Sequence, residues 1–599
     1  MENKDEWNEI EELEREIALL PAGSISSKKV RGKEYYYHRI TEGGKRRETY
    51  VDFDKVENLR VQIEKRKALE TKLKALKRTV SAGQAAEKRK KAEHIFSTYT
   101  RIGEQLTRLA EPVKAYRHRA CYSVLRDFVF GEPQDKVLIL YGLRRTGKTT
   151  MIRQILLEMS PEELKKTAFL QIRSSNTLSV VNTDLQYLEK NGFQYVFIDE
   201  VTLMQDFIEG AALFSDIYAA SGMTIVLSGT DSLGFVFTEH DQLYDRCVML
   251  HTTFIPYREF ENVLGIKGID EYIRYGGTMS ISGAHYNETS TFASKKSADE
   301  YINSAIAHNI QHSLQYYQDG GHFRLLYELY QKGELTSAIN RVVEDLNHRF
   351  TKEVLTRTFR SSDLSIASRN LLKDRENPIN LLDKIDREKV EHALKTMLDI
   401  LDVEEQCVEI DEAHANQIKE YLTLLDLVMD IDQVYLPEPG GKTEKSVFSQ
   451  PGMRYALAEA LVSTMLRDEK FSNLDAMERS RILERILDTV RGFMMEEIVL
   501  LETKIAFPHK QVFRVQFAIG EFDMVVFDPS DTSCSLFEIK HSKELVAEQY
   551  RHLIDKEKCA AITHRFGRIT GKYVLYRGNA EESNGVQYLN VEEYLKELP

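Results

Sequence analysis

The sequence predicts a multidomain α/β protein, and three observations support this fold class. The chain has 599 residues, more than one hydrophobic core normally serves, so roughly two to four domains are expected. Between about residues 116 and 250, short apolar runs alternate with amphipathic segments, which is typical of a parallel sheet with crossover helices. A mostly helical region follows, and beyond it the pattern changes to a helix, strands and a polar helix. We predict domains at residues 1–92, 93–260, 261–490 and 491–599.

The overall composition is that of a globular protein, with 42% hydrophobic and 29% charged residues, and it excludes wholesale disorder. No apolar run approaches the roughly 20 residues needed to cross a bilayer, and the acidic first residues are unlike a secretory signal. The five cysteines lie far apart without a CxxC pair, which argues against a structural zinc site. We therefore expect a cytoplasmic protein without a membrane partner.

The N-terminal segment carries an excess of positive charge. Residues 21–90 contain 20 Lys and Arg against 9 Asp and Glu, whereas the remainder of the chain has 61 against 85. Two β-rich runs about Gly43–Gly44, with tyrosines at Tyr35–Tyr37, predict a small basic hairpin, followed by a helix that breaks near Ser81–Gln84. Such a hairpin could bind phosphates and bases of nucleic acid, or it could dock on the acidic remainder of the chain.

The strongest motif is a glycine-rich loop between a predicted strand and a predicted helix. The run VLILY at 137–141 precedes GLRRTGKT at 142–149, which matches G-x-x-x-x-G-K-[ST]. In such a loop the backbone N–H groups and the helix N-terminus surround phosphate oxygens. Lys148 is expected to reach the β- and γ-phosphates, and Thr149 is expected to ligate Mg²⁺. A glycine-rich turn without nucleotide is the alternative, which the flanking elements disfavour.

Two later strands are expected to end beside this loop. The run YVFIDE ends in Asp199, which would hold the Mg²⁺ ion, and in Glu200, which would activate the attacking water as general base. Arg246 is a candidate sensor or trans-acting arginine, and a structural arginine is an equal alternative. The run TIVLSGTDS ends in polar residues that could sense the γ-phosphate: Ser228, Thr230 and Asp231.

Together these motifs predict ATP and Mg²⁺ as cofactors. The expected Mg²⁺ ligands here are Thr149 and Asp199, and the expected catalytic residue is Glu200. The residues expected to bind the nucleotide are Gly142, Arg145, Thr146, Gly147, Lys148, Thr149, Thr150, Thr230 and Arg246.

A second group of candidate catalytic residues lies near the C-terminus. Asp523 lies on one predicted strand, and Glu538 and Lys540 lie two residues apart on the next, so strand periodicity places this pair on one face. The connector DPSDTS favours a hairpin that brings Asp523 to the pair. Two carboxylates and a lysine suit Mg²⁺-dependent phosphodiester hydrolysis. We predict Asp523, Glu538 and Lys540 as catalytic, with Asp523, Glu538 and Glu496 as metal ligands.

The motifs GLRRTGKTT, FIDE, LSGTDS, FIPYREF and YIRYGG occur in this order. The set resembles the prokaryotic AAA/STAND-like P-loop ATPases that carry a C-terminal PD-(D/E)XK nuclease-like domain. The resemblance covers the chain from about Tyr116 to its end, and it leaves out the basic N-terminal segment. It implies an ATPase core, a helical or winged-helix middle region and a nuclease-like C-terminal domain.

These observations predict an ATP-hydrolysing P-loop ATPase that is coupled to a nuclease-like domain and acts on nucleic acid, with DNA as the expected partner. The alternative is a STAND-type signalling ATPase whose C-terminal domain binds without cleaving. A small-molecule kinase is disfavoured by the long helical insert and the SGTDS run. A homo-oligomer is compatible with all of these hypotheses.

Overall fold

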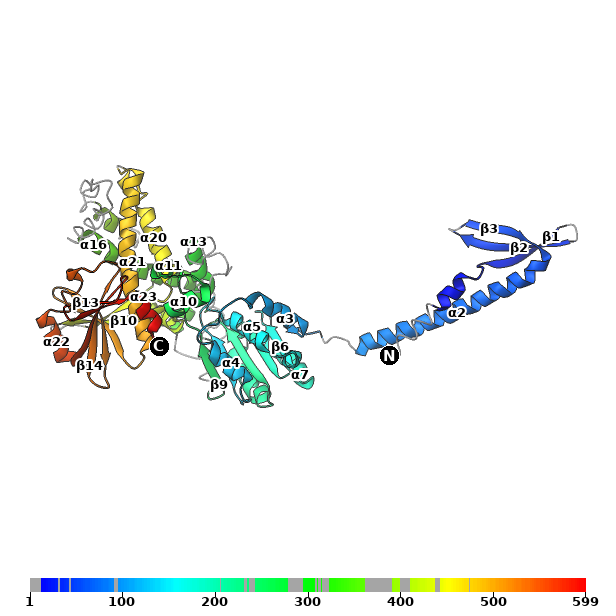
Figure 1. Cartoon of the computed structure of the whole chain (residues 1–599), viewed down its shortest axis with the longest axis horizontal. Helices are drawn as coiled ribbons and strands as arrows, with labels where there is room; N and C mark the ends of the chain where they lie inside the picture. The colour runs from blue at the N-terminus through cyan, green and yellow to red at the C-terminus, as the bar shows by residue number, and fades with distance from the viewer. Residues whose placement is uncertain are drawn as a thin grey trace. The chain divides into compact units, whose positions relative to one another are not determined.

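The computed structural model divides the chain into two compact units, Met1–Ile95 and Phe96–Pro599 (Figure 1). The predicted domain boundaries at 260 and 490 both fall inside the second unit. The described residues are 12–30, 33–42, 45–90, 95–204, 206–230, 234–235, 243–277, 295–307, 310, 314, 323–360, 390, 392–398, 410–436, 442–472 and 474–599.

The N-terminal unit is a small antiparallel sheet with a long helix. Its strands are β1 (Ser24–Val30), β2 (Lys33–Glu42) and β3 (Lys45–Val51), in the order β1-β2-β3, so one strand more than the predicted hairpin is present. Helix α2 (Phe53–Lys90) continues through Ser81–Gln84, where we predicted a break. The single glycine in that stretch lowers helix propensity by only about 1 kcal/mol, which the flanking helix formers outweigh.

The predicted apolar runs form a parallel sheet at the start of the second unit. The strand order is β4-β6-β7-β8-β5-β9, and every pairing is parallel except that of β4 with β6. This confirms the predicted parallel α/β core. The strands are β4 (Tyr99–Ile102), β5 (Val137–Tyr141), β6 (Thr167–Gln171), β7 (Tyr195–Asp199), β8 (Thr224–Gly229) and β9 (Cys247–His251).

Helices and helical turns cover both faces of this sheet. One apolar cluster joins α3, α4 and α5 to the sheet, and a second joins α7, α8 and η3 to the opposite face. The elements are α3 (Glu104–Ala110), η1 (Glu111–Val113), α4 (Tyr122–Phe130), α5 (Lys148–Glu158), α6 (Pro161–Lys165), α7 (Leu178–Lys190), η2 (Val201–Leu203), α8 (Phe207–Gly210) and η3 (Phe214–Ala219).

The middle region is mainly helical, as predicted, but it also contributes a hairpin to the C-terminal sheet. Strands β10 (Val428–Leu436) and β11 (Lys442–Phe448) pair with each other, and β10 pairs with β12. The described helices are α10 (Tyr257–Leu264), α11 (Ile269–Tyr275), α13 (Lys295–Tyr301), η4 (Ile302–Ala307), α15 (Arg324–Gln331), α16 (Leu335–Arg360), α19 (Glu412–Leu424), α20 (Pro451–Met465), η6 (Glu469–Phe471) and α21 (Ala476–Ala506). The winged-helix form stays a prediction.

The C-terminal sheet has the order β11-β10-β12-β13-β14-β15-β17-β16. Strands β12, β13 and β14 form an antiparallel meander, and β15 is parallel to β14. The elements are β12 (Gln511–Phe517), β13 (Glu521–Asp528), β14 (Ser533–Lys540), η7 (Ala547–Gln549), α22 (Lys556–Phe566), β15 (Arg568–Tyr576), β16 (Glu581–Ser583), β17 (Val586–Asn590) and α23 (Val591–Glu597).

Helix α21 connects the middle region to this sheet, and it crosses the predicted boundary between residues 490 and 491 (Figure 1). A capping box of Asp475 and Glu478 starts the helix, which satisfies backbone donors at its N-terminus. Its buried face shares one apolar core with α10, α11, α20 and strands of the C-terminal sheet. The middle and C-terminal regions therefore fold around a common core. Within the described residues, no helix is both long and apolar enough to span a membrane.

Candidate functional site

The loop between β5 and α5 has the backbone geometry that the glycine-rich motif predicts. Gly142 has φ +133°, and a Cβ atom there would lie 2.2 Å from the carbonyl oxygen of Thr252. Gly147, directly before α5, has φ +96°. An L-residue with a side chain rarely adopts either conformation. The two glycines therefore let the chain turn tightly into the N-terminus of α5, where backbone N–H groups can bind phosphate.

Lys148 is buried inside this loop. Its Nζ donates hydrogen bonds to the carbonyl oxygens of Gly142, at 2.9 Å, and Leu143, at 2.7 Å. Burial lowers the pKa of Lys148 to about 8, and the nearby charges of Glu200 and Asp199 oppose this shift. The ammonium group is thus held by neutral acceptors, which a phosphate oxygen can replace.

Asp199 stands where the ends of β7, β8 and the P-loop meet. Its Oδ2 accepts a hydrogen bond from Thr149 Oγ1 at 2.9 Å, and its Oδ1 accepts one from Ser228 Oγ at 2.7 Å. A hydroxyl and a carboxylate this close together at the mouth of a phosphate loop fit a hydrated Mg²⁺ ion. The structure brings the two predicted Mg²⁺ ligands together.

Glu200 follows Asp199 in the left-handed region, with φ +57°. Thr230 Oγ1 donates a hydrogen bond to Glu200 Oε2 at 3.3 Å. Burial, together with the charge of Asp199, raises the pKa of Glu200, and Lys148 opposes the shift. A carboxylate with a raised pKa suits a general base. The predicted γ-phosphate sensor Asp231 lies outside the described residues.

The other predicted loop residues contribute in different ways. Thr146 Oγ1 donates to the carbonyl oxygen of Leu143 at 2.8 Å, so its buried side chain stabilises the loop. The Arg145 guanidinium lies 5.6 Å from the ring centroid of Tyr301, in the middle region. Thr150 is half-buried in the first turn of α5. Backbone N–H groups at these positions remain the expected hydrogen-bond donors to phosphate.

Arg246 requires a correction. It directly precedes β9, and its carbonyl oxygen accepts a hydrogen bond from Val137 N at the start of β5. Because β5 and β9 are parallel, Arg246 lies at the sheet edge opposite the P-loop, about 16 Å away along five residues of strand. Its Nε pairs with Asp216 at 3.0 Å. Arg246 is therefore not a nucleotide ligand of its own chain.

The sequence interpretation missed a buried ion pair behind the P-loop. Arg119 Nε donates to Glu259 Oε2 at 2.8 Å, and both side chains are at least 90% buried. Arg119 also donates to the carbonyl oxygens of Thr146 at 2.9 Å and Phe254 at 3.1 Å. Glu259 belongs to the FIPYREF motif. This pair therefore ties the back of the P-loop to α10.

Helices α10 and α11 also contact the C-terminal region. Glu502 Oε1, on α21, accepts hydrogen bonds from Tyr257 N at 2.8 Å and Tyr272 Oη at 2.9 Å. Asp270 Oδ1 lies 2.8 Å from the Nε2 atom of His541. His541 directly follows Lys540 on the chain. Polar contacts thus link the P-loop to α10, and they link α10 and α11 to the C-terminal region at Glu502 and His541.

The hairpin of β13 and β14 brings Asp523, Glu538 and Lys540 together as predicted from strand periodicity. Lys540 Nζ lies 2.7 Å from Asp523 Oδ2 and 2.7 Å from Glu538 Oε2. Asp523 Oδ2 also accepts a hydrogen bond from Ile539 N at 2.8 Å. Both carboxylates are at least 97% buried, whereas Lys540 is partly exposed.

The charges in this cluster shift one another's pKa values. Burial opposes ionisation of Asp523, but Lys540, Arg357 and Arg514 outweigh it and hold the pKa of Asp523 below its usual range. Burial raises the pKa of Glu538 well above its usual value, and the neighbouring charge of Asp523 adds to this shift. Two carboxylates with separated pKa values suit divided acid and base roles.

Glu496 takes different partners from those predicted. Its Oε1 lies 2.9 Å from Arg357 Nη1, and its Oε2 lies 3.4 Å from Arg514 Nη2. Across the described residues, no group of three or more His, Cys, Asp or Glu is arranged to hold a metal ion. Asp523 Oδ1 and Glu538 Oε1 are nevertheless buried and have no hydrogen-bond partner among described residues. This oxygen pair fits a cation better than Glu496 does.

Comparison with protein-family models finds two matches. Residues 134–261 match an AAA domain (AAA_14), and residues 4–61 match a domain of unknown function (DUF6788). The AAA match spans the P-loop, Asp199, Glu200 and the FIPYREF motif. This match supports the predicted P-loop ATPase class for this part of the chain.

Two solved structures show weak similarity to the chain. One is the Aeropyrum pernix ORC1 protein in complex with DNA, at 16% identity over 60% of this chain and 93% of that chain, with a TM-score of 0.21. The other is the S. cerevisiae Hsp104:casein complex in its extended conformation, at 13% identity over 52% of this chain and 61% of that chain, with a TM-score of 0.23. No curated protein matches the chain.

Proposed function

We propose that ATP binding and hydrolysis at the P-loop control a Mg²⁺-dependent, nuclease-like C-terminal domain that acts on nucleic acid, with DNA as the expected substrate. The observation that carries this proposal is the cluster of Asp523, Glu538 and Lys540 at the ends of adjacent strands. Helix α21, the meander β12–β14, helix α22 and the parallel strand β15 follow in the order expected for a PD-(D/E)XK-like fold. This order supports the assignment.

The contacts of each side chain indicate the role that it would have at this site. When bound, Mg²⁺ would polarise the phosphodiester and activate a water molecule. The buried oxygens Asp523 Oδ1 and Glu538 Oε1 are the groups that would hold the ion. Lys540, which is 24% exposed, would offset negative charge that develops on the phosphate. Arg357 and Arg514 would neutralise Glu496 behind the site.

The contacts of α10 and α11 support coupling between the two sites. A change in loop conformation on nucleotide binding would act on Arg119 through the carbonyl oxygen of Thr146. Glu259 would pass that change to α10, and Asp270 lies against His541, the neighbour of Lys540. Helices α10 and α11 would move as a pair between two states, and ligand binding at either site would shift the balance between those states.

A cleavage assay tests the nuclease half of the proposal. Plasmid and linear DNA are incubated with the full chain and Mg²⁺ or Mn²⁺, with and without ATP. We expect Glu538→Gln to abolish cleavage and the exposed control Glu548→Gln to retain it. Equal cleavage by both variants would contradict the assignment of Glu538.

The ATPase half has its own test. Glu200→Gln should bind ATP with unchanged affinity but hydrolyse it at least about 100-fold more slowly, because removing a general base typically costs 10²–10⁴-fold in rate. Nucleotide binding is measured by calorimetry, and hydrolysis by phosphate release. Turnover at the wild-type rate would show that another group activates the water.

A second candidate function is a signalling ATPase whose C-terminal domain binds nucleic acid without cutting it. One observation favours it: Lys540 lies against both carboxylates, and Glu496 is held by two arginines. Intact DNA under every condition, with retained ATP hydrolysis and ATP-dependent DNA binding, would select this candidate.

A further inference from the structure

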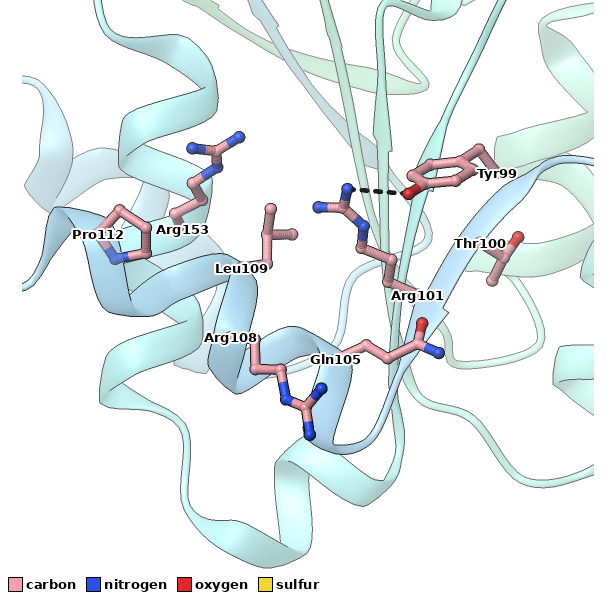
Figure 2. Close-up of a pocket in the computed structure, with 8 residues that line it drawn as sticks. All are labelled: Tyr99, Thr100, Arg101, Gln105, Arg108, Leu109, Pro112 and Arg153. Carbon is pink, nitrogen blue, oxygen red and sulfur yellow. Dashed lines mark hydrogen bonds between the residues drawn. The ribbon is translucent and has the colours of Figure 1, made fainter. Parts of the chain in front are cut away.

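A pocket lies beside the parallel sheet of the second unit, where β4, α3 and α5 meet. It has a volume of about 560 Å³ and opens to solvent. This volume is in the range of small-molecule sites, which is roughly 300–1,000 Å³. None of the predicted nucleotide ligands lines it. The lining residues are Tyr99, Thr100, Arg101, Gln105, Arg108, Leu109, Pro112 and Arg153 (Figure 2).

All charged residues that line this pocket are positive. Three of its eight lining residues are arginines and none is acidic. Neither Arg101 nor Arg153 has a carboxylate within 4 Å in the described part of the chain, and the Arg153 Nε is buried without a hydrogen-bond partner there. Arg108 makes one loose contact, 3.7 Å from Glu104, with both side chains exposed. Three cations with so little compensation are expected to attract an anion.

The remaining lining residues suit an anionic ligand that carries a ring rather than a simple inorganic anion. Tyr99 is 48% exposed, and the Arg101 guanidinium lies 4.9 Å from the centroid of its ring. In Figure 2 the side chain of Leu109 lies between those of Arg101 and Arg153, while Arg108 extends away from both. Aromatic and aliphatic surfaces beside arginines are the combination that stacks a base while its phosphate is neutralised.

We propose that this pocket binds a nucleoside phosphate, either within a single strand of nucleic acid or as a free nucleotide. Arg101 and Arg153 contact the phosphate, and Tyr99 and Leu109 contact the base. Arg108 extends the positive surface along the entering chain. The inference deepens the proposed function, because it gives the AAA domain its own contact with nucleic acid.

The position of Arg153 connects this pocket to the ATP site. Arg153 lies four residues after Thr149 on α5, one turn of helix away. Burial lowers the pKa of Arg153, and the charge of Asp199 opposes the shift. A ligand held by Arg153 would therefore change the electrostatic surroundings of Asp199, the predicted Mg²⁺ ligand.

Binding of a fluorescein-labelled 12-nucleotide oligo-dT to the full chain tests the proposal. The double variant Arg101→Ala/Arg108→Ala should bind at least tenfold more weakly than wild type. The slope of log K against log salt should become shallower by about 1.4, because each single-strand phosphate contact contributes about 0.7. The matched control Lys165→Ala/Lys190→Ala removes two exposed charges from the same domain and should bind as wild type does.

Two further measurements identify the ligand and its place. A 4-thiothymidine strand should cross-link to a peptide that contains Tyr99. Competition for the labelled strand is measured on the Lys148→Ala chain. Displacement of the labelled strand by AMP would identify free nucleotide as a ligand, whereas displacement by unlabelled oligo-dT alone would identify the strand. Inorganic phosphate should displace the labelled strand far less well than either competitor. Equal affinities of the two double variants, together with a cross-link elsewhere, would overturn the proposal. DNA cleavage that persists in that case would leave the proposed function intact.

Discussion

Two lysines, one in each candidate site, differ in what holds them. Lys148 donates to two backbone carbonyl oxygens in the P-loop, and burial lowers its pKa to about 8. Lys540 lies between two carboxylates; burial alone would lower its pKa, but Asp523 and Glu538 outweigh burial and raise it. The same residue type therefore has opposite shifts in the two sites.

This difference bears on what each lysine can do. Neutral carbonyl oxygens hold a buried ammonium weakly, so Lys148 can exchange them for a charged phosphate oxygen at little cost. Lys540 already compensates two buried carboxylates, and removing it would leave them without their contacting cation. The first lysine is available to bind a ligand, whereas the second keeps its own site assembled.

The largest expected effect comes from replacing each lysine by methionine. Lys540→Met should lower the free energy of unfolding by about 4 kcal/mol, because it removes the cation that lies against the buried carboxylates of Asp523 and Glu538. Lys148→Met should leave the unfolding free energy within about 1 kcal/mol of wild type, because it removes a desolvated charge that has no carboxylate partner. Urea-induced unfolding of both variants measures the difference.

The two variants also serve as controls for each other. Lys148→Met should abolish ATP binding in calorimetry while Lys540→Met retains it at temperatures below its unfolding transition. Equal destabilisation by the two substitutions would break the comparison, since it would mean that the carbonyl oxygens hold Lys148 as firmly as carboxylates hold Lys540.

The next effect concerns Glu502, which connects α21 to α10. Burial raises the pKa of Glu502 from 4.5 to about 7; its hydrogen bonds from Tyr257 and Tyr272 and the charge of Arg258 oppose the shift. The folded chain therefore keeps a proton that the unfolded chain loses, and the contribution of Glu502 to stability should fall as pH rises from 4.5 to 7. The whole shift corresponds to about 3 kcal/mol.

Glu502→Gln removes the carboxyl group whose protonation differs between the folded and unfolded chain. Relative to wild type, the variant should gain stability progressively between pH 4.5 and 7, by up to about 3 kcal/mol. Unfolding curves at several pH values provide the measurement. Glu484→Gln, at an exposed position on the same helix, should follow the wild-type pH profile. A pH-independent difference between Glu502→Gln and wild type would show that Glu502 is ionised throughout.

A smaller effect is expected on nucleotide affinity. Because the pKa of Lys148 is about 8, the ammonium form that binds phosphate is depleted as pH rises above 8. ATP affinity should then fall by at most tenfold for each pH unit, or about 1.4 kcal/mol. Calorimetry between pH 7 and 9.5 checks this. Constant affinity up to pH 9.5 would mean that Lys148 stays protonated well above pH 8.

The parts of the two sites that sequence alone identified are the local ones. The P-loop is one contiguous run, and its glycines and Lys148 follow from the needs of a strand–loop–helix turn. Glu538 and Lys540 lie two residues apart on a strand, so their common face follows from periodicity. Fold class could be predicted for the same reason, because the alternation of apolar runs with amphipathic segments is a local pattern.

The missed parts depend on contacts between distant segments. Arg119 and Glu259 are 140 residues apart, and nothing in either local sequence marks them as partners. Glu502 reaches Tyr257 across 245 residues. The predicted boundary at residue 490 lies within α21, which is continuous there because its buried face packs on both sides of that residue.

Arg246 provides the smallest predicted effect, and it shows an error that chain direction alone could have prevented. Asp199 ends β7, and Lys148 and Thr230 lie beyond the ends of β5 and β8, whereas Arg246 precedes β9. A parallel sheet places strand starts and strand ends at opposite edges. Its pair with Asp216 is about half exposed. Arg246→Ala should therefore lower the unfolding free energy by no more than about 0.5 kcal/mol. ATP affinity should be unchanged.

ATP hydrolysis by Arg246→Ala, measured over a range of protein concentrations, completes the test. A loss of hydrolysis relative to wild type that grows with concentration would reveal a trans-acting arginine in an oligomer. A loss of hydrolysis at every concentration would contradict the position of Arg246 at the far edge of the sheet.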